Sequence, residues 1–309
     1  MNTLAENKGL LLIFSTAVIS GFSIFINKFG VNEFNPYLFA FLKNLVVAAF
    51  LIGFILGLKE FKNLKTLCRK DWFVLTLIGL IGGCVPFLLF FKGLALTTAA
   101  NGAFIHKTMF IYVALLATVF LKEKIPNRFL IAGAFLLMGN LFFLKFLPYG
   151  AGQGDLLILL ATLFWAAENI ISKHALKTLS SRIVAFGRMG IGSVFILIFL
   201  ILTGNTQAIS NLTPLHFQWV MISAIFLFGY VITWYSGLKQ ISVTKATTIL
   251  LLGSPITSLL TFVFQGQVFT IHQALGSFLL LVGIAIVIGF RKIWKTLIFI
   301  PRLIYVFRT

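Results

Sequence analysis

Four charged side chains lie inside long apolar stretches of this sequence, where a charge has a high energetic cost. They are Lys43, Lys107, Glu168 and Arg188, and His106 and Asn101 lie in the same surroundings as Lys107. A charge at the centre of a membrane-spanning helix costs about 2.5–3.5 kcal/mol on insertion scales. Each of these side chains is therefore a candidate for binding an ion or a substrate.

The stretch FWAAENIISK places three different chemical groups on one helical face. Trp165, Glu168 and Ser172 are separated by three and four residues, so a helix directs all three the same way. They offer an aromatic surface, a carboxylate and a hydroxyl. Glu168 is interpreted as a proton-coupling site or as the partner of a buried cation, with helix packing as the alternative.

Lys107 lies deep in the apolar stretch GAFIHKTMFIYVALLATVF, about nine residues or ~13 Å along a helix. Three interpretations compete: it binds the carboxylate or phosphate of a small metabolite, it pairs with Glu168, or it extends to the outer headgroups. We favour the first, because an ammonium group is a compact charge with three donors. Phe104, Phe110 and Ile111 are expected on the neighbouring wall.

The depth of the other charges gives further expectations. Arg188 lies near the inner end of its stretch and is expected to extend to the headgroups. Two positions remain equally expected for the Lys43 side chain: it faces a cavity, or it extends to the headgroups. The candidate substrate-binding residues are Lys107, Glu168, Trp165, Phe104, His106, Asn101 and Lys43.

The amino-acid composition indicates whether water or lipid surrounds these residues. Of 309 residues, 60% are hydrophobic and only 10% are charged, and the mean hydropathy is +1.05. Soluble domains carry roughly 25% charged residues, so this chain cannot cover a water-facing surface. Its apolar runs are continuous rather than alternating, which favours helices over the strands of a barrel.

Ten stretches are long enough to cross a hydrocarbon core of about 30 Å. They cover 9–28, 34–57, 72–92, 98–121, 128–146, 155–174, 183–203, 216–238, 244–264 and 271–290. We therefore expect an all-α integral membrane protein with ten transmembrane helices.

The net charge of +18 is distributed unevenly between alternate loops. If the N-terminus is cytoplasmic, most Lys and Arg residues lie in cytoplasmic loops and the tail, while the outer connections hold little more than Lys28, Lys92 and Lys145. This asymmetry predicts a plasma (inner) membrane protein with both termini in the cytoplasm. It also accounts for the basic charge, so we expect no nucleic-acid partner.

The two halves of the chain repeat one another. Residues 91–141 align with 235–285 without a gap, and 9–28 align with 154–173. The matched pairs include Gly93 with Gly237, Gly139 with Gly283, and Lys28 with Lys173. Because each half has an odd number of spans, the second half enters the membrane from the opposite side.

The predicted units are two inverted-topology five-helix repeats, 9–146 and 154–290, followed by a basic interfacial tail, 291–309. Inverted repeats are typical of secondary transporters, which bind substrate near the bilayer midplane between the repeats.

Three segments carry a family resemblance: SGFSIFINK, VALLATVFLKEKIPNRFLIAGAFLLMGN and GSPITSLLTFVFQGQVFTIHQALGSFLLLVGI. With them, the chain resembles the EamA-type family of the drug/metabolite transporter superfamily over residues 9–290. The resemblance implies ten helices in two inverted repeats, a central cavity, cytoplasmic termini, and transport of amino acids, other small metabolites or drugs.

Some positions depart from the family pattern. Ser20-Gly21 replaces an aromatic-Gly pair, the fourth span lacks the proline that the ninth keeps as Pro255, and the Glu123 position is Gln267 in the second repeat. These departures bear on the substrate class rather than on the fold.

We expect a secondary transporter that moves a small polar, anionic or zwitterionic metabolite by alternating access. The alternative is a lipid or polyprenyl-carrier flippase of the same fold. Protons are a candidate coupling ion, and a monomer is expected. The sequence has no Gly-rich phosphate loop, zinc-binding helix or nucleophile elbow, so no enzymatic activity, metal or cofactor is predicted.

Overall fold

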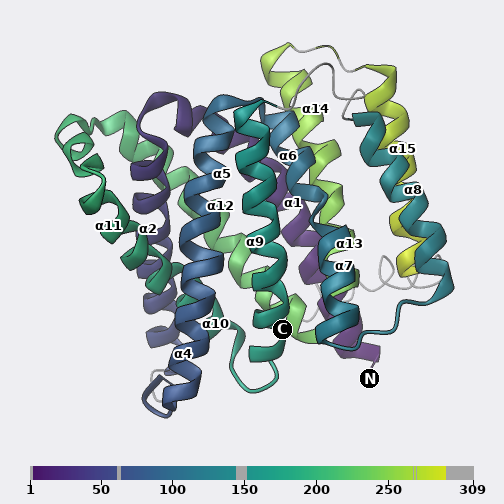
Figure 1. Cartoon of the computed structure of the whole chain (residues 1–309), viewed down its shortest axis with the longest axis horizontal. Coiled ribbons are helices and arrows are strands. Elements are labelled where there is room, and N and C mark those ends of the chain that lie inside the picture. The colour runs from purple at the N-terminus through teal and green to yellow at the C-terminus, as the bar shows by residue number, and fades with distance from the viewer. Residues whose placement is uncertain (1–2, 61–63, 144–151, 267, 269, 290–309) are drawn as a thin grey trace, which may run out of the picture.

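The computed structural model describes residues 3–60, 64–143, 152–266, 268 and 270–289, and they form a bundle of long helices (Figure 1). Within this part of the chain, nine helical spans are long and apolar enough to cross a membrane, and a shorter apolar helix is the tenth. The expected fold class is confirmed. The predicted tail, 291–309, and Gln267 lie outside the described residues.

Five spans are single helices and four have a break or a changed pitch. The single long helices are α1 (Thr3–Glu33), α2 (Pro36–Gly57), α9 (Gln153–Ala175), α12 (Pro214–Gln240) and α15 (Ile271–Ile288). The composite spans are α4–η1–α5 (Arg69–Ile78, Gly79–Cys84, Val85–Leu96), α6–α7 (Ala99–Lys107, Met109–Phe120), α10–η2–α11 (Ser181–Phe186, Gly187–Ile191, Gly192–Leu202) and α13–η4–α14 (Val243–Ile249, Leu250–Leu252, Gly253–Gln265). The shorter helix is α8 (Asn127–Phe143), and η3 (Asn205–Asn211) is a 3₁₀ helix in a connection.

The two repeats are interlocked rather than side by side. Helix α1, the first span of repeat one, packs along α12, the third span of repeat two. The equivalent pair with the repeats exchanged, α9 with α5, also packs together. The fifth spans, α8 and α15, pack mainly on each other and stand beside the rest of the bundle (Figure 1).

The paired lysines that revealed the repeat have the same structural role in each half. Lys28 Nζ donates to the backbone oxygens of Leu94 and Ala95, at 2.9 and 3.3 Å, where α5 ends. Lys173 Nζ donates to the oxygens of Leu238 and Ile241, at 2.6 and 2.7 Å, where α12 ends. Because the last carbonyls of a helix lack partners within it, each ammonium group stabilises a helix C-terminus.

The fourth span of each repeat is interrupted at equivalent positions. Helix α6 ends at Lys107 and the next helix begins at Met109, while a 3₁₀ turn at Leu250–Leu252 separates α13 from α14. Leu251 is the repeat counterpart of Lys107. Helices α6 and α14 pack together, as do α7 and α13, so the two broken spans pack along each other.

Two π-helical turns meet where the third and seventh spans cross. They are η1 and η2, and the backbones approach so closely that a Cβ on Gly83 would overlap the carbonyl oxygen of Arg188. Only glycine fits there, and small residues of this kind allow helices to approach closely. π-Turns are frequent at functional sites.

Candidate functional site

A cavity of about 560 Å³, a volume that includes the open space at its mouth, lies between the repeats. Helices α1, α2, α5, α6 and α7 supply its wall from the first repeat, and α9, η2 and α12 supply it from the second. The lining residues are Ser20, Ser23, Ile24, Asn27, Lys43, Phe87, Phe90, Phe91, His106, Met109, Trp165, Asn169, Arg188, Leu227 and Tyr230. Among the seven predicted site residues, this wall includes Lys43, His106 and Trp165.

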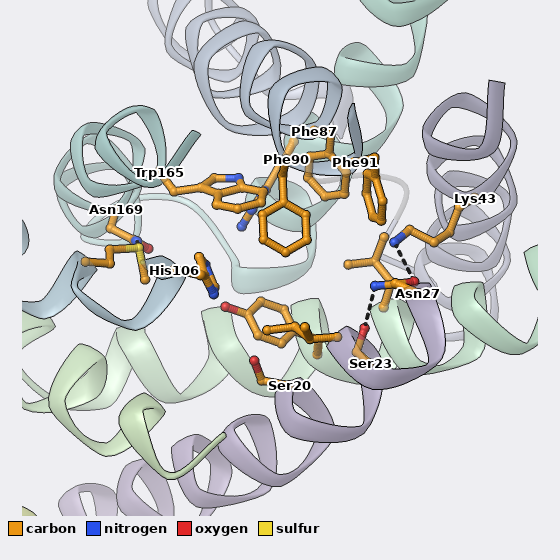
Figure 2. A pocket seen from close by; sticks show the side chains of 15 residues that line it. Ser20, Ser23, Asn27, Lys43, Phe87, Phe90, Phe91, His106, Trp165 and Asn169 are labelled. Atoms are coloured by element: carbon orange, nitrogen blue, oxygen red, sulfur yellow. Dashed lines mark hydrogen bonds between the residues drawn. The ribbon is translucent and has the colours of Figure 1, made fainter. Parts of the chain in front are cut away.

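Lys43 occupies one end of the cavity (Figure 2). Its side chain is 1% exposed, its Nζ donates to Asn27 Oδ1 at 3.3 Å, and it lies 3.9 Å from the centre of the Phe91 ring. Asn27 Nδ2 in turn donates to Ser23 Oγ at 3.2 Å. Lys43 thus lies at the cavity rather than at the headgroups, and no carboxylate in the described part of the chain pairs with it.

Aromatic side chains extend from Lys43 along the cavity wall to its opposite end (Figure 2). The rings of Trp165 and His106 lie 4.9 Å apart between centres, and Phe90 lies 5.2 Å from Trp165. Trp165 Nε1 donates to the backbone oxygen of Gly82 at 2.9 Å, so the indole presents only its apolar surface to the space. His106 Nδ1 is buried and has no hydrogen-bond partner.

The expectation that Arg188 extends to the headgroups is wrong. The residue is 5% exposed, and Nε donates to the oxygen of Gly82 at 3.1 Å while Nη1 donates to Tyr235 Oη at 3.3 Å. Its Nη1 lies 3.7 Å from Glu168 Oε2. The sequence did not predict this position, although the glycines around Arg188 in GRMGIG are a signal of close packing, because small residues let helices approach and enclose a side chain.

Glu168 lies behind the cavity wall as the buried counter-ion of Arg188. Its Oε1 accepts from Tyr235 Oη at 2.6 Å and from Ser172, one turn along the same helix. Trp165, Glu168 and Ser172 are all buried, in keeping with one inward face of α9. Of the two functional interpretations of Glu168, the structure contains the pairing with a buried cation, and that cation is Arg188 rather than Lys107.

Lys107 is separated from the cavity by one side chain. It is 1% exposed, and its Nζ donates to Ser20 Oγ at 2.6 Å, a hydroxyl that lines the cavity. It neither extends to the headgroups nor forms an ion pair in the described part of the chain. Phe104 is buried outside the set of lining residues, and Asn101 is exposed near the start of α6.

The electrostatic character of the cavity follows from this arrangement. Its wall contains two strong bases, Lys43 and Arg188, and no acidic side chain among the described residues. Glu168 offsets the positive charge of Arg188. The neighbours of Lys43 Nζ are instead the amide oxygen of Asn27 and the face of the Phe91 ring, and neither carries a negative charge. A buried cation without a counter-ion attracts an anion strongly, because the surrounding dielectric constant is low.

A family model for the EamA-like transporter family matches residues 7–145 and again residues 152–289. The chain belongs to this family. Both copies of the family unit are thus present, and each contains five of the helical spans described above.

Individual relatives of this EamA-like chain agree with a transport role. The "Uncharacterized transporter YyaM" of Bacillus subtilis is 25% identical over 90% of this chain and 94% of its own length. The "Riboflavin transporter ImpX" of Fusobacterium nucleatum subsp. nucleatum is 28% identical over 90% and 96%. One solved crystal structure matches with a TM-score of 0.72 at 16% identity, over 90% of this chain and 96% of that one, which shows a shared fold.

Proposed function

We propose that this EamA-like protein is a secondary transporter that moves a small polar metabolite, anionic or zwitterionic, by alternating access. The observation that carries the proposal is the position and charge of the cavity. It lies between two interlocked repeats, and its wall includes the buried amine of Lys43, which has no carboxylate partner in the described residues and which an arriving anion would hold in its charged form. Transporters built from inverted repeats bind their substrates at such interfaces.

The fold offers moving parts for alternating access. The broken spans α6–α7 and α13–η4–α14 pack along each other, α6–α7 lines the cavity, and η1 meets η2 at a contact of glycines. Helix breaks and π-turns concentrate bending at a few residues. We infer that one repeat rocks against the other around these points while the cavity residues keep hold of the substrate.

Proton coupling is the proposed energy source, with Glu168 as its site. Glu168 Oε2 is buried without a hydrogen-bond partner and faces Arg188 at 3.7 Å, a loose ion pair. A substrate anion that attracts the guanidinium of Arg188 would weaken this pair and favour protonation of Glu168. We further propose a monomer in the plasma membrane with the N-terminus and the basic loops on the cytoplasmic side.

The test is uptake of labelled solutes by proteoliposomes, using a panel of carboxylates, amino acids and riboflavin. We expect Lys43→Met to abolish uptake of the transported solute and Lys43→Arg to retain part of it. Lys92→Met is the matched control, since this lysine lies on α5 outside the set of cavity residues. If no solute is taken up while labelled lipid crosses the same membranes, the protein is a flippase and the proposal fails.

A further inference from the structure

Resting on the proposed function, we propose that the substrate is a planar aromatic carboxylate with a hydrogen-bonding group on the ring, on the side away from the carboxylate. The carboxylate binds Lys43, the ring lies against Phe90 and Trp165, and the distal polar group binds His106. This arrangement names a substrate class within the broader group of polar metabolites.

The charge at the Lys43 end selects an anion. Lys43 Nζ has Asn27 Oδ1 at 3.3 Å and the Phe91 ring at 3.9 Å, and neither neutralises it. An ammonium group of a zwitterion would find no carboxylate in the described wall, because the nearest acid, Glu168, lies behind Arg188. A carboxylate without a neighbouring amine therefore matches this wall better than an amino acid does.

The middle of the cavity selects a flat ring. Phe87, Phe90, Phe91, Trp165 and Tyr230 together supply most of the bulky wall. Phe87 and Trp165 lie 5.5 Å apart between ring centres and nearly perpendicular, at 88°. Aromatic walls of this kind favour ring substrates through offset and edge-to-face contacts. The indole N–H of Trp165 is already bound to Gly82, so this side chain recognises a surface rather than an acceptor.

The far end of the cavity requires a polar group from the ligand. His106 is 7% exposed and its Nδ1 has no hydrogen-bond partner, which is costly for a buried polar atom. Asn169, a polar lining residue on the same side of the cavity, is already engaged with Met109 and Trp234. Figure 2 shows His106 directed into the space on the side away from Lys43. A hydroxyl or ring N–H of the substrate satisfies this nitrogen once the imidazole turns Nδ1 toward the space.

The experiment is equilibrium binding of labelled 4-hydroxybenzoate to the purified full-length protein in detergent, with four unlabelled competitors. Benzoate lacks the distal hydroxyl, 4-hydroxybenzamide lacks the charge, cyclohexanecarboxylate lacks the flat ring, and tyrosine adds an amine. We expect the amide, the cyclohexane acid and tyrosine to compete at least tenfold more weakly than 4-hydroxybenzoate, and benzoate several-fold more weakly.

Two variants test which side chain binds each end of the ligand. Lys43→Met should weaken 4-hydroxybenzoate binding at least tenfold, while Lys92→Met leaves it unchanged. His106→Phe should weaken 4-hydroxybenzoate to the level of benzoate and leave benzoate itself unaffected. Because a phenyl ring fills the imidazole volume without its nitrogens, a merely structural role of His106 would change both ligands equally. If His106→Phe elutes as aggregate in size-exclusion chromatography, His106→Gln replaces it, with benzoate binding as the internal reference.

Equal competition by cyclohexanecarboxylate or by the amide overturns the proposal, as does absence of 4-hydroxybenzoate binding. These results leave the proposed function standing if proteoliposomes still take up a non-aromatic or zwitterionic solute in a manner dependent on Lys43. Failure of the proposed function is a different result, namely no uptake of any solute in the panel.

Discussion

Replacing Glu168 by glutamine tests the buried ion pair that the structure places behind the cavity. The substitution keeps the size of the side chain and an oxygen able to accept from Tyr235 Oη, which now donates to Oε1 at 2.6 Å. What it removes is the negative charge 3.7 Å from Arg188 Nη1. The guanidinium then remains buried with only neutral partners, Gly82 and Tyr235.

The expected loss is large. Two unit charges about 4 Å apart attract by about 4 kcal/mol at an effective dielectric constant of ~20. Removing one member of a buried pair typically costs about 3–5 kcal/mol, because the other charge stays desolvated. We expect a value near the lower limit, about 3 kcal/mol, because Arg188 keeps its hydrogen bonds to Gly82 and Tyr235.

The assay is unfolding in mixed detergent micelles, followed by tryptophan fluorescence and by loss of the monodisperse peak. Glu168→Gln is compared with Arg188→Met and with the double variant in a double-mutant cycle. We expect the double variant to be more stable than Glu168→Gln alone, since it no longer buries an unpaired cation. Glu33→Gln is the control, because Glu33 is an exposed carboxylate at the end of α1.

A Glu168→Gln protein within about 0.5 kcal/mol of the wild type would refute this reasoning. The same conclusion follows if the double variant is no more stable than Glu168→Gln, because Arg188 would then have another source of compensation. The proposed coupling role is tested by measuring the transport rate of Glu168→Gln while the outside pH is varied. An unchanged rate and pH profile removes the proposed coupling role.

Three further predictions concern other charged residues. Glu123 accepts from the backbone N–H groups of Val243 and Thr244, at 3.0 and 3.3 Å, and so caps α13. Glu123→Ala should lower the free energy of unfolding by about 1–2 kcal/mol in the same assay, and a change of less than a few tenths would contradict the cap. Hydrogen bonding from Arg182 lowers the pKa of Glu60 below its ordinary value of 4.5. The ionised Glu60 therefore stabilises the folded protein fully above pH 4.5, and this contribution is lost as the pH falls through the lower pKa of the folded state. The stability difference between wild type and Glu60→Gln should therefore shrink on acidification below 4.5, and a constant difference would contradict it. Lys107→Met removes a buried amine whose hydrogen-bond partner is the hydroxyl of Ser20, so we expect a gain of about 1 kcal/mol or more in stability in the same unfolding assay. A destabilised variant would show that Lys107 is electrostatically compensated.

The sequence by itself determined the membrane class, the number of spans and the repeat. These features depend only on the order of residues along the chain, because an apolar run of about 20 residues can span the membrane whatever its neighbours are. A sequence repeat can likewise be recognised without knowing which helices pack together. The pairing of Lys28 with Lys173 in the alignment corresponds to one structural role in both halves. The inward direction of Trp165, Glu168 and Ser172 also followed from the helical period alone.

Only the tertiary structure decided which inward-facing residues meet. Position along a span gives depth, and depth suggested Lys107 as a partner of Glu168. The lateral position of each span depends on how the repeats interlock, and the contact of η1 with η2 brings Arg188 to Glu168 instead. The same packing places Lys107 behind Ser20 and leaves Lys43 in the cavity wall. Side-chain neighbours across helices depend on close approach at glycines such as Gly83, which no single-span pattern specifies.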